Sequence, residues 1–386
     1  MADLSSRKLK WRDQSLEFLI ENDRIPSRFA GPDPLSYSEL QGKVSNEIFS
    51  SGDKVPFALR DLIIGGDRIV IPVNGGSKQL FAPLNELISN FEQSGVSKSD
   101  ITILSTPEFK SYWDENSDLK VNAVAHKPED EQERAYLAST SDETRIYLNR
   151  NLLDHDIVIP LMVTEPNCKG ASLGYLSQIW PFFSDSQSIS SIQTKHRKAR
   201  QSVRRTIREA IWLSGLHLVI ASIPSATGIA SIKIYQPEFM QHELNQEINQ
   251  KWRFLLKNEI QQVILLAGLD DEMPMEEADF EQFARTVARV SRYTDKLAIV
   301  AELSPGMIEK VESLSPTELK LQPWYQSLSI AASRCKTYIL SNLSDETSDD
   351  IELISLESAI ELERLVRSGP AWAMVECANR ARIVFD

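Results

Sequence analysis

The sequence has few of the features that would reveal a function directly. Its 386 residues hold only three cysteines, Cys168, Cys335 and Cys377, which lie far apart and form no CxxC pair. Neither a disulfide framework nor a thiolate zinc site is therefore expected. No apolar run approaches the roughly 20 residues of a membrane span, and the first twenty residues contain no apolar segment typical of a signal peptide. We therefore expect a cytoplasmic protein.

Positive charge is also scarce. The chain carries 42 Lys and Arg against 55 Asp and Glu, a formal net charge of −13. An acidic chain repels nucleic acid, so the expected partner is a small anionic metabolite, with neither nucleic acid nor a membrane. The composition does not decide the oligomeric state.

One segment departs from this acidic average. A basic amphipathic helix is predicted over residues 193–215, and Arg197, Arg200, Arg204 and Arg208 lie on one face of it. These guanidinium groups either bind phosphate or carboxylate groups or form a solvated face that pairs with acidic neighbours such as Glu209.

What the sequence does contain is a regular alternation of strands and helices. A β-branched run at 68–73, a helical pattern at 80–95 and a second strand at 100–105 predict a parallel βαβ unit. Further strands are expected at 119–126, 144–150 and 156–163. A glutamine-rich helix follows at 243–258.

The alternation then restarts, which suggests a second domain. Its predicted elements are strands at 261–268, 296–303 and 336–343, and helices at 276–291 and 355–369, with an acidic loop at 344–350. We therefore expect two α/β domains with mostly parallel sheets around an interdomain cleft. The first is residues 1–258, which includes an N-terminal arm at 1–55, and the second is residues 259–386.

Two loops are candidates for a binding site because ligands of open α/β sheets lie where loops leave the carboxyl ends of strands. The first is "NGGS" at 74–77, which lies between a strand and a helix and so has the context of an anion nest or of a plain turn. The second follows the strand at 156–163 and reads "EPNCKGASLGYLS". Its Gly170 and Gly174 permit close approach of a ligand to the backbone, and Glu165 is either a general base or a capping carboxylate.

Several phrases of the sequence resemble the nickel-dependent lactate racemase family. "GGDRIVIPV", "SGVSKSDITIL" and "DIVIPLMVTEP" are similar to its first domain, and "MPMEEADFEQFARTVARVSRYTDKLAIVAELSPG" is similar to its second, over about residues 55–305. The resemblance implies two α/β domains around a cleft. It also implies racemisation of 2-hydroxy acids by hydride transfer with a nickel pincer nucleotide tethered to a lysine.

The positions that carry the family's chemistry are largely replaced. The resemblance places Asn74 and Ser77 at the family's Asp and Arg, Asn167 at a histidine, and Ser177 at the tethering lysine. Glu281 and Ala284 stand at its Gln and Lys. His196 is the one residue that the resemblance places at a retained family position, that of the nickel-ligating histidine, after a three-residue insertion.

These observations define the candidate site residues. The catalytic candidates are Glu165, Lys169 and His196, and His196 is also the candidate metal ligand. The candidates for cofactor or ligand binding are Asn74, Gly75, Gly76, Ser77, Asn167, Gly170 and Ser177. The remaining histidines, His126 and His155 among them, are interpreted as structural.

Three functions remain open. The first, which the resemblance implies, is a lactate-racemase-like isomerase of 2-hydroxy acids with a rearranged site, although the replaced tether and histidines argue against racemase activity and against the nickel pincer nucleotide. Alternatively, the chain is a catalytically silent protein that binds a small anion, or a different enzyme on the same fold without that cofactor. Whether it is an enzyme is left undecided.

Overall fold

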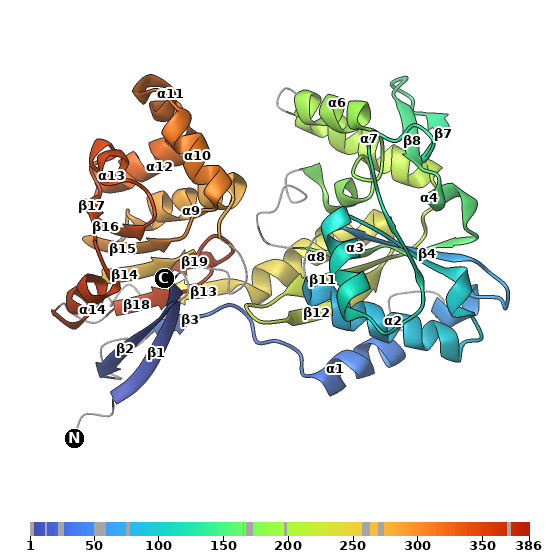
Figure 1. Cartoon of the computed structure of the whole chain (residues 1–386), viewed down its shortest axis with the longest axis horizontal. Helices are drawn as coiled ribbons and strands as arrows, with labels where there is room; N and C mark the ends of the chain where they lie inside the picture. Colours follow the sequence, from blue (N-terminus) through green and yellow to red (C-terminus); the bar gives the residue numbers. More distant parts are fainter. Residues whose placement is uncertain are drawn as a thin grey trace. The chain divides into compact units, whose positions relative to one another are not determined.

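The structure is a computed structural model that describes residues 4–11, 14–21, 27–49, 59–74, 78–164, 166, 173–196, 199–256, 263–268, 274–368 and 372–386. The chain forms two compact units (Figure 1). Unit 1 comprises Met1–Pro32 and Asn249–Asp386, and unit 2 comprises Asp33–Ile248.

A mostly parallel sheet forms the centre of unit 2. Its strand order is β12-β11-β10-β4-β5-β6, with β9 pairing beside β4. Only the β11–β12 pair is antiparallel. The strands are β4 (Ile69–Asn74), β5 (Ile101–Ser105), β6 (Asn122–Ala125), β9 (Ile157–Val158), β10 (Leu161–Val163), β11 (Val219–Pro224) and β12 (Ile229–Tyr235). β5 and β11 are buried along their whole length, as expected for strands covered on both faces.

Helices cover this sheet. α2 (Phe81–Gln93) and α3 (Pro107–Asn116) bury Leu84, Phe91 and Trp113 in one core cluster with Ile69 and Ile71 of β4. The other helices are α1 (Tyr37–Gly42), α4 (Asn151–Asp154), α6 (Ser186–His196), α7 (Arg200–Leu213) and α8 (Pro237–Lys251). Short 3-10 turns occur at η2 (Leu59–Leu62), η3 (Lys78–Leu80), η4 (Lys98–Asp100) and η5 (Tyr175–Gln178), and a π-helical turn, η1, at Lys43–Ile48.

The order of the strands creates a switch point beside β4. From β4 the chain proceeds to β5 and β6 on one side, and it later enters β10 and β11 on the other side. Because parallel crossovers are right-handed, connections that run in opposite directions place their helices on opposite faces. The loops after β4 and β10 therefore diverge, which is where open α/β sheets bind ligands.

Unit 1 has a second parallel sheet, of order β17-β16-β15-β14-β18-β3. Its strands are β3 (Ser27–Phe29), β14 (Val263–Ala267), β15 (Lys296–Ala301), β16 (Lys336–Ser341), β17 (Ile354–Ser355) and β18 (Trp372–Val375). Two small two-stranded sheets accompany it: a parallel pair of β13 (Arg253–Leu256) and β19 (Arg382–Phe385), and an antiparallel pair of β1 (Leu4–Trp11) and β2 (Gln14–Glu21).

Six helices complete the described part of unit 1. They are α9 (Glu277–Val290), α10 (Pro305–Ser313), α11 (Pro316–Lys320), α12 (Pro323–Ala332), α13 (Asp345–Asp350) and α14 (Ala359–Ser368). α9 and α12 pack together through Phe280 and Trp324, whose ring centroids lie 5.2 Å apart. Within the described residues, no helix combines the length and apolar character needed to cross a membrane.

The α/β class with mostly parallel sheets is confirmed, but several elements differ from their predictions. The first residues of the predicted arm belong with the C-terminal half of the chain, because β3 pairs with β18. The helix predicted to reach 258 ends at Lys251, since pairing with β19 makes residues 253–256 a strand. The predicted domain boundary at 258 falls within residues 257–262, which lie outside the described residues.

Two further corrections concern helices, and one concerns a strand. The acidic segment at 344–350 is helical, because Ser344 caps α13 and Asp345 and Glu346 favour its first turn. The basic helix at 193–215 is two helices, since Ala199 has a non-helical backbone (φ −145°, ψ 60°) before α7. The strand predicted at 144–150 is β8 (Arg145–Asn149), but it forms a hairpin with β7 (Arg134–Ser139) outside the main sheet.

Candidate functional site

The candidate site lies at the carboxyl edge of the unit 2 sheet, beside the switch point. Asn74 is the last residue of β4 and the Cα partner of Met162 in β10. Its side-chain amide donates a hydrogen bond to the carbonyl oxygen of Gln178, 2.9 Å away. This bond joins the end of the central strand to η5, the 3-10 turn that holds Ser177. The structure thus brings two predicted site residues, Asn74 and Ser177, into the same neighbourhood.

α8 holds η5 in place from its other side. Gln241 accepts a hydrogen bond from the backbone N–H of Tyr175 (2.9 Å), and Asn245 accepts one from the Tyr175 hydroxyl (3.0 Å). Gly174 precedes the turn with φ 101°, a conformation that favours glycine. A Cβ atom at this position would also lie 3.3 Å from the Gln241 side chain. The position of Ser177 is therefore set by packing, and its own N–H bonds the Gly174 carbonyl.

Hydroxyl side chains line the ends of the neighbouring strands. Thr164 follows β10 and donates from its hydroxyl to the Ser222 carbonyl (2.8 Å), while the Ser222 hydroxyl donates to the Met162 carbonyl (3.0 Å). Ser105 ends β5 and is fully buried. The hydroxyl of Ser225, which follows β11, accepts bonds from the N–H groups of Thr227 and Gly228. These residues were not predicted from the sequence, although a hydroxyl directly after a buried strand was the available signal.

Helix N-termini supply the positive potential at this edge. α2 and α3 both begin here, after β4 and β5, and the N-terminus of a helix carries a partial positive charge. Thr106 caps α3, whereas no side chain caps α2 at Leu80. The strand-end side chains described above are neutral, so the edge combines hydrogen-bonding groups with helix dipoles and suits a small anion.

Most of the other predicted site residues lie outside the described part of the chain. This is true of Gly75, Gly76, Ser77, Glu165, Asn167, Lys169 and Gly170. His196 is the last residue of α6, and only its backbone position is described. Their roles, including metal ligation by His196, stay predictions. Among the residues that the structure does describe, no group of three or more His, Cys, Asp or Glu side chains could hold a metal ion.

The two residues that the resemblance places at the family's Gln and Lys have structural roles in this protein. Ala284 is fully buried in the core cluster of unit 1. Glu281 forms an ion pair with Arg285 one helical turn later. The side chain at 284 therefore packs in the core and is not available to a ligand.

His126 is a buried histidine that follows β6 at the same carboxyl edge. Its Nδ1 accepts a hydrogen bond from the Asn149 amide (3.2 Å), so its Nε2–H donates to the Ser184 carbonyl (3.0 Å). This pattern requires a neutral ring, and burial lowers the pKa of His126 accordingly. The space beside the ring is only about 10 Å³, which holds no more than a single water molecule. His126 is therefore a structural residue.

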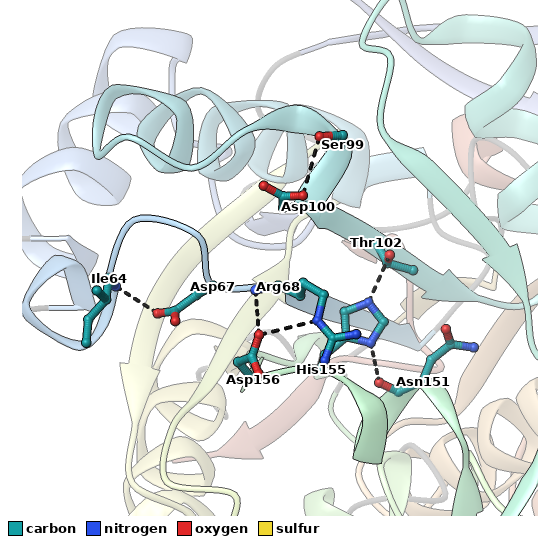
Figure 2. A network of polar contacts seen from close by, with 9 residues as sticks. All are labelled: Ile64, Asp67, Arg68, Ser99, Asp100, Thr102, Asn151, His155 and Asp156. Atoms are coloured by element: carbon teal, nitrogen blue, oxygen red, sulfur yellow. Dashed lines mark hydrogen bonds and ion pairs between the residues drawn. The ribbon is translucent and has the colours of Figure 1, made fainter.

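The opposite, amino edge of the sheet carries charge (Figure 2). The Asp156 carboxylate accepts hydrogen bonds from the backbone N–H (2.9 Å) and Nε (3.4 Å) of Arg68. The backbone bond is the main cause that lowers the pKa of Asp156. His155 bonds the Asn151 carbonyl (2.7 Å) and the Thr102 hydroxyl (3.0 Å). These contacts tie the starts of β4, β5 and β9 together, and both ring nitrogens of His155 have partners.

α7 is bonded to the turn of the β7–β8 hairpin through residues that lie beside its arginines. Glu209 binds the backbone N–H (2.6 Å) and hydroxyl (2.8 Å) of Ser141 rather than a neighbouring arginine. Thr206 donates to Asp142 (3.1 Å). Ser141 and Asp142, in the turn of the β7–β8 hairpin, are thereby bonded to α7. These contacts do not decide between the two interpretations of the arginines.

The fold is similar to that of known proteins. The structure matches the lactate racemase apoprotein from Thermoanaerobacterium thermosaccharolyticum with a TM-score of 0.64 and 13% identity, over 98% of this chain and 100% of that one. It also matches a protein from Thermotoga maritima with a TM-score of 0.57 and 11% identity, over 93% and 100% of the two chains. The sequence matches no protein-family model and no curated protein. The predicted resemblance to lactate racemase is therefore confirmed at the level of the fold.

Proposed function

We propose that the carboxyl edge of the unit 2 sheet binds a small carboxylate, such as a 2-hydroxy acid, without a tethered nickel cofactor. The hydrogen bond from Asn74 to the Gln178 carbonyl carries this proposal. It brings the end of the central strand and the segment around Ser177 together at the switch point of the sheet. This is where the fold favours a ligand.

The chemistry of the edge suits binding better than racemisation. A bound carboxylate is stabilised by helix N-termini, and α2 and α3 begin at this edge. Racemisation of a 2-hydroxy acid also needs a hydride acceptor and a base for the hydroxyl proton. The imidazole described at this edge, His126, has both nitrogens engaged and a lowered pKa.

The residues at this edge do not fit the nickel pincer nucleotide. A lysine amine forms the tether in the family, whereas the resemblance places the hydroxyl of Ser177 at that position. The neighbouring Asn74 amide is engaged with Gln178. We therefore assign no step to that group, and the protein is proposed to be a binding protein on a lactate-racemase-like fold.

A pair of matched substitutions tests the proposal. Asn74→Asp places a negative charge at the carboxyl edge, and Asn122→Asp places the same charge at the start of β6 on the amino edge. At an effective dielectric of about 20, a charge about 5 Å from the ligand costs about 3 kcal/mol. We expect calorimetry with D- and L-lactate to show a loss of about 100-fold for Asn74→Asp and little change for Asn122→Asp. The affinity of the neutral variant Asn74→Ala should lie between those of the two aspartate variants.

Two results would contradict the proposal. One is equal binding by both aspartate variants and the unsubstituted protein. The other is nickel together with a covalent adduct on intact-mass analysis of protein from its native host, which would support an active isomerase with a rearranged site.

A different enzyme on the same fold remains the alternative. It would use Glu165, Lys169 or His196 and no tethered cofactor. Alanine at each of these positions should then abolish turnover of a hydroxy acid or sugar acid that the unsubstituted protein converts. Binding without any turnover would support the binding protein instead.

A further inference from the structure

An open groove of about 660 Å³ lies in unit 1, at the amino edge of its sheet. Its walls come from the turn between α9 and β15 and from the turn between α12 and β16. The lining residues are Ser291, Arg292, Tyr293, Thr294, Asp295 and Arg334. Ligand pockets typically measure about 300–1,000 Å³, so the groove is large enough for a small organic molecule.

Positive charge is concentrated at this edge of an acidic protein. Lys296 and Lys336 begin neighbouring strands and are Cα partners in the β15–β16 pair. Like charges on paired strand positions repel one another, so this lysine pair beside the groove favours an anionic ligand.

The described carboxylates do not neutralise these cations. Among the described residues, no ion pair involves Arg292, Arg334, Lys296 or Lys336. Of the described residues that line the groove, Asp295 is the only acid, against Arg292 and Arg334, so the walls carry net positive charge.

An aromatic ring stands beside these cations. Tyr293 is 52% exposed, and its ring stacks on Phe385 with centroids 3.9 Å apart and an angle of 15° between the planes. Phe385 covers one face of Tyr293, and a planar ligand can stack on the other. Stacking between a base and an aromatic side chain is a common and favourable contact.

Arg334 is already oriented. Its Nη1 donates to the carbonyl of Ala288 near the end of α9, at 3.0 Å. A guanidinium group has five N–H donors, so this bond fixes its plane and leaves the remaining donors for a ligand. Planar guanidinium groups match the geometry of phosphate oxygens.

We propose that this groove binds a nucleoside monophosphate. Arg292 and Arg334 hold the phosphate, the base stacks on Tyr293, and Asp295 accepts hydrogen bonds from the sugar hydroxyls. The site is independent of the carboxyl edge of unit 2, because all of its residues belong to unit 1.

Calorimetry on the full chain tests the proposal with adenosine 5′-monophosphate and uridine 5′-monophosphate as probes. Ribose 5-phosphate lacks the base, and adenosine lacks the phosphate. We expect at least one nucleotide to bind about ten-fold or more tightly than either fragment, because each fragment loses one of the two contacts.

Variants locate the binding in the groove. Arg334→Ala should weaken nucleotide binding about ten-fold or more, and Arg334→Lys should weaken it less because the charge remains. Arg145→Ala, at an exposed residue that begins β8 in unit 2, is the matched control and should change nothing. Tyr293→Leu should weaken binding of the nucleotide but not of ribose 5-phosphate. Thermal unfolding of each variant confirms that it is folded.

Several outcomes would overturn the proposal. They are no binding of either nucleotide, equal affinity for the nucleotide and ribose 5-phosphate, or full affinity in Arg334→Ala. Tighter binding of an oligothymidylate than of either mononucleotide would also overturn it, because it would assign the edge to single-stranded nucleic acid.

Discussion

The two edges of the unit 2 sheet are built from the same strands but differ in their chemistry. At the amino edge, Arg68, Asp156 and His155 bind one another or nearby backbone and hydroxyl groups (Figure 2). At the carboxyl edge, the strands end in neutral side chains such as Asn74 and Thr164, beside the starts of α2 and α3. Charged groups at the amino edge therefore bond the strands to one another. At the carboxyl edge, the positive electrostatic potential of the helix N-termini is available to a ligand.

Each edge also holds a histidine with polar partners, His126 or His155, and the two differ in burial. His126 is 7% exposed at the carboxyl edge, and its two bonds require a neutral ring. His155 is only partly buried at the amino edge and lies beside the carboxylate of Asp156. The two rings therefore provide a direct way to compare the edges.

The largest expected effect comes from removing these rings. His126→Ala opens a cavity and leaves the buried Ser184 carbonyl without its donor, so we expect a loss of about 2–4 kcal/mol in the free energy of unfolding. His155→Ala should cost about 1–2 kcal/mol because water reaches its partners. Urea unfolding measures both free energies. Equal losses in the two variants would show that the difference in burial between the two histidines does not affect stability.

A smaller effect is expected for the amides. Asn74→Ala removes the bond to the Gln178 carbonyl in a partly buried place and should cost about 1 kcal/mol. Asn122→Ala is the control, since the Asn122 side chain is exposed and its amide lies 3.4 Å from the Thr102 hydroxyl. Its unfolding midpoint in urea should stay close to that of the unsubstituted protein. A larger loss at Asn122 would reverse the comparison.

Acidification should affect the two edges in different pH ranges. Because burial lowers the pKa of His126 below 6.5 in the folded state, the unfolded chain binds the proton first and stability falls as the pH drops below about 6.5. The lowered pKa of Asp156 stabilises the protein above about 3.8, and that contribution is lost only as the pH falls below this value. Urea midpoints between pH 7 and pH 5 should fall less steeply in His126→Gln than in the unsubstituted protein. Asp156→Asn should leave that slope unchanged.

The smallest effect is expected for the surface ion pair. The Arg68 and Asp156 side chains are 56% and 49% exposed, and exposed pairs contribute about 0–1 kcal/mol. Arg68→Ala should therefore shift the urea midpoint little, and the shift should shrink further in high salt. Asp156→Ala should cost more, because the carboxylate also accepts a bond from the Arg68 backbone. A reversed order would show that the side-chain pair dominates.

Local patterns were enough to predict the elements around the site. The β-branched run that precedes Asn74 predicted β4. Asn74 was predicted as a site residue because it follows that run and begins a loop. Ser177 was found only through the resemblance to lactate racemases. Thr164 and Ser222 were missed because their importance depends on the pairing of β10 with β11, which no local pattern encodes.

The incorrect predictions for residues 253–256 and for the N-terminal arm share one physical cause, which is pairing between distant segments. Residues 253–256 follow a helical pattern, but they form a strand because β19 pairs with them from the end of the chain. β3 is three residues long and lies in a sheet only through β18. The like-charged partners at the amino edge of unit 1 were invisible for the same reason, since Lys296 and Lys336 are forty positions apart in the sequence.

The parallel pairing of β3 with β18 has a consequence for biosynthesis. Unit 2 is a continuous segment inserted into unit 1, whose two parts it separates. Domains generally fold as units during translation, starting from the N-terminus. Unit 2 can therefore complete its sheet while β3 is still unpaired, because β18 has not yet left the ribosome. Until β18 emerges, the edge formed by residues 27–29 has no native strand to pair with, and this short strand limits how much exposed edge the nascent chain presents.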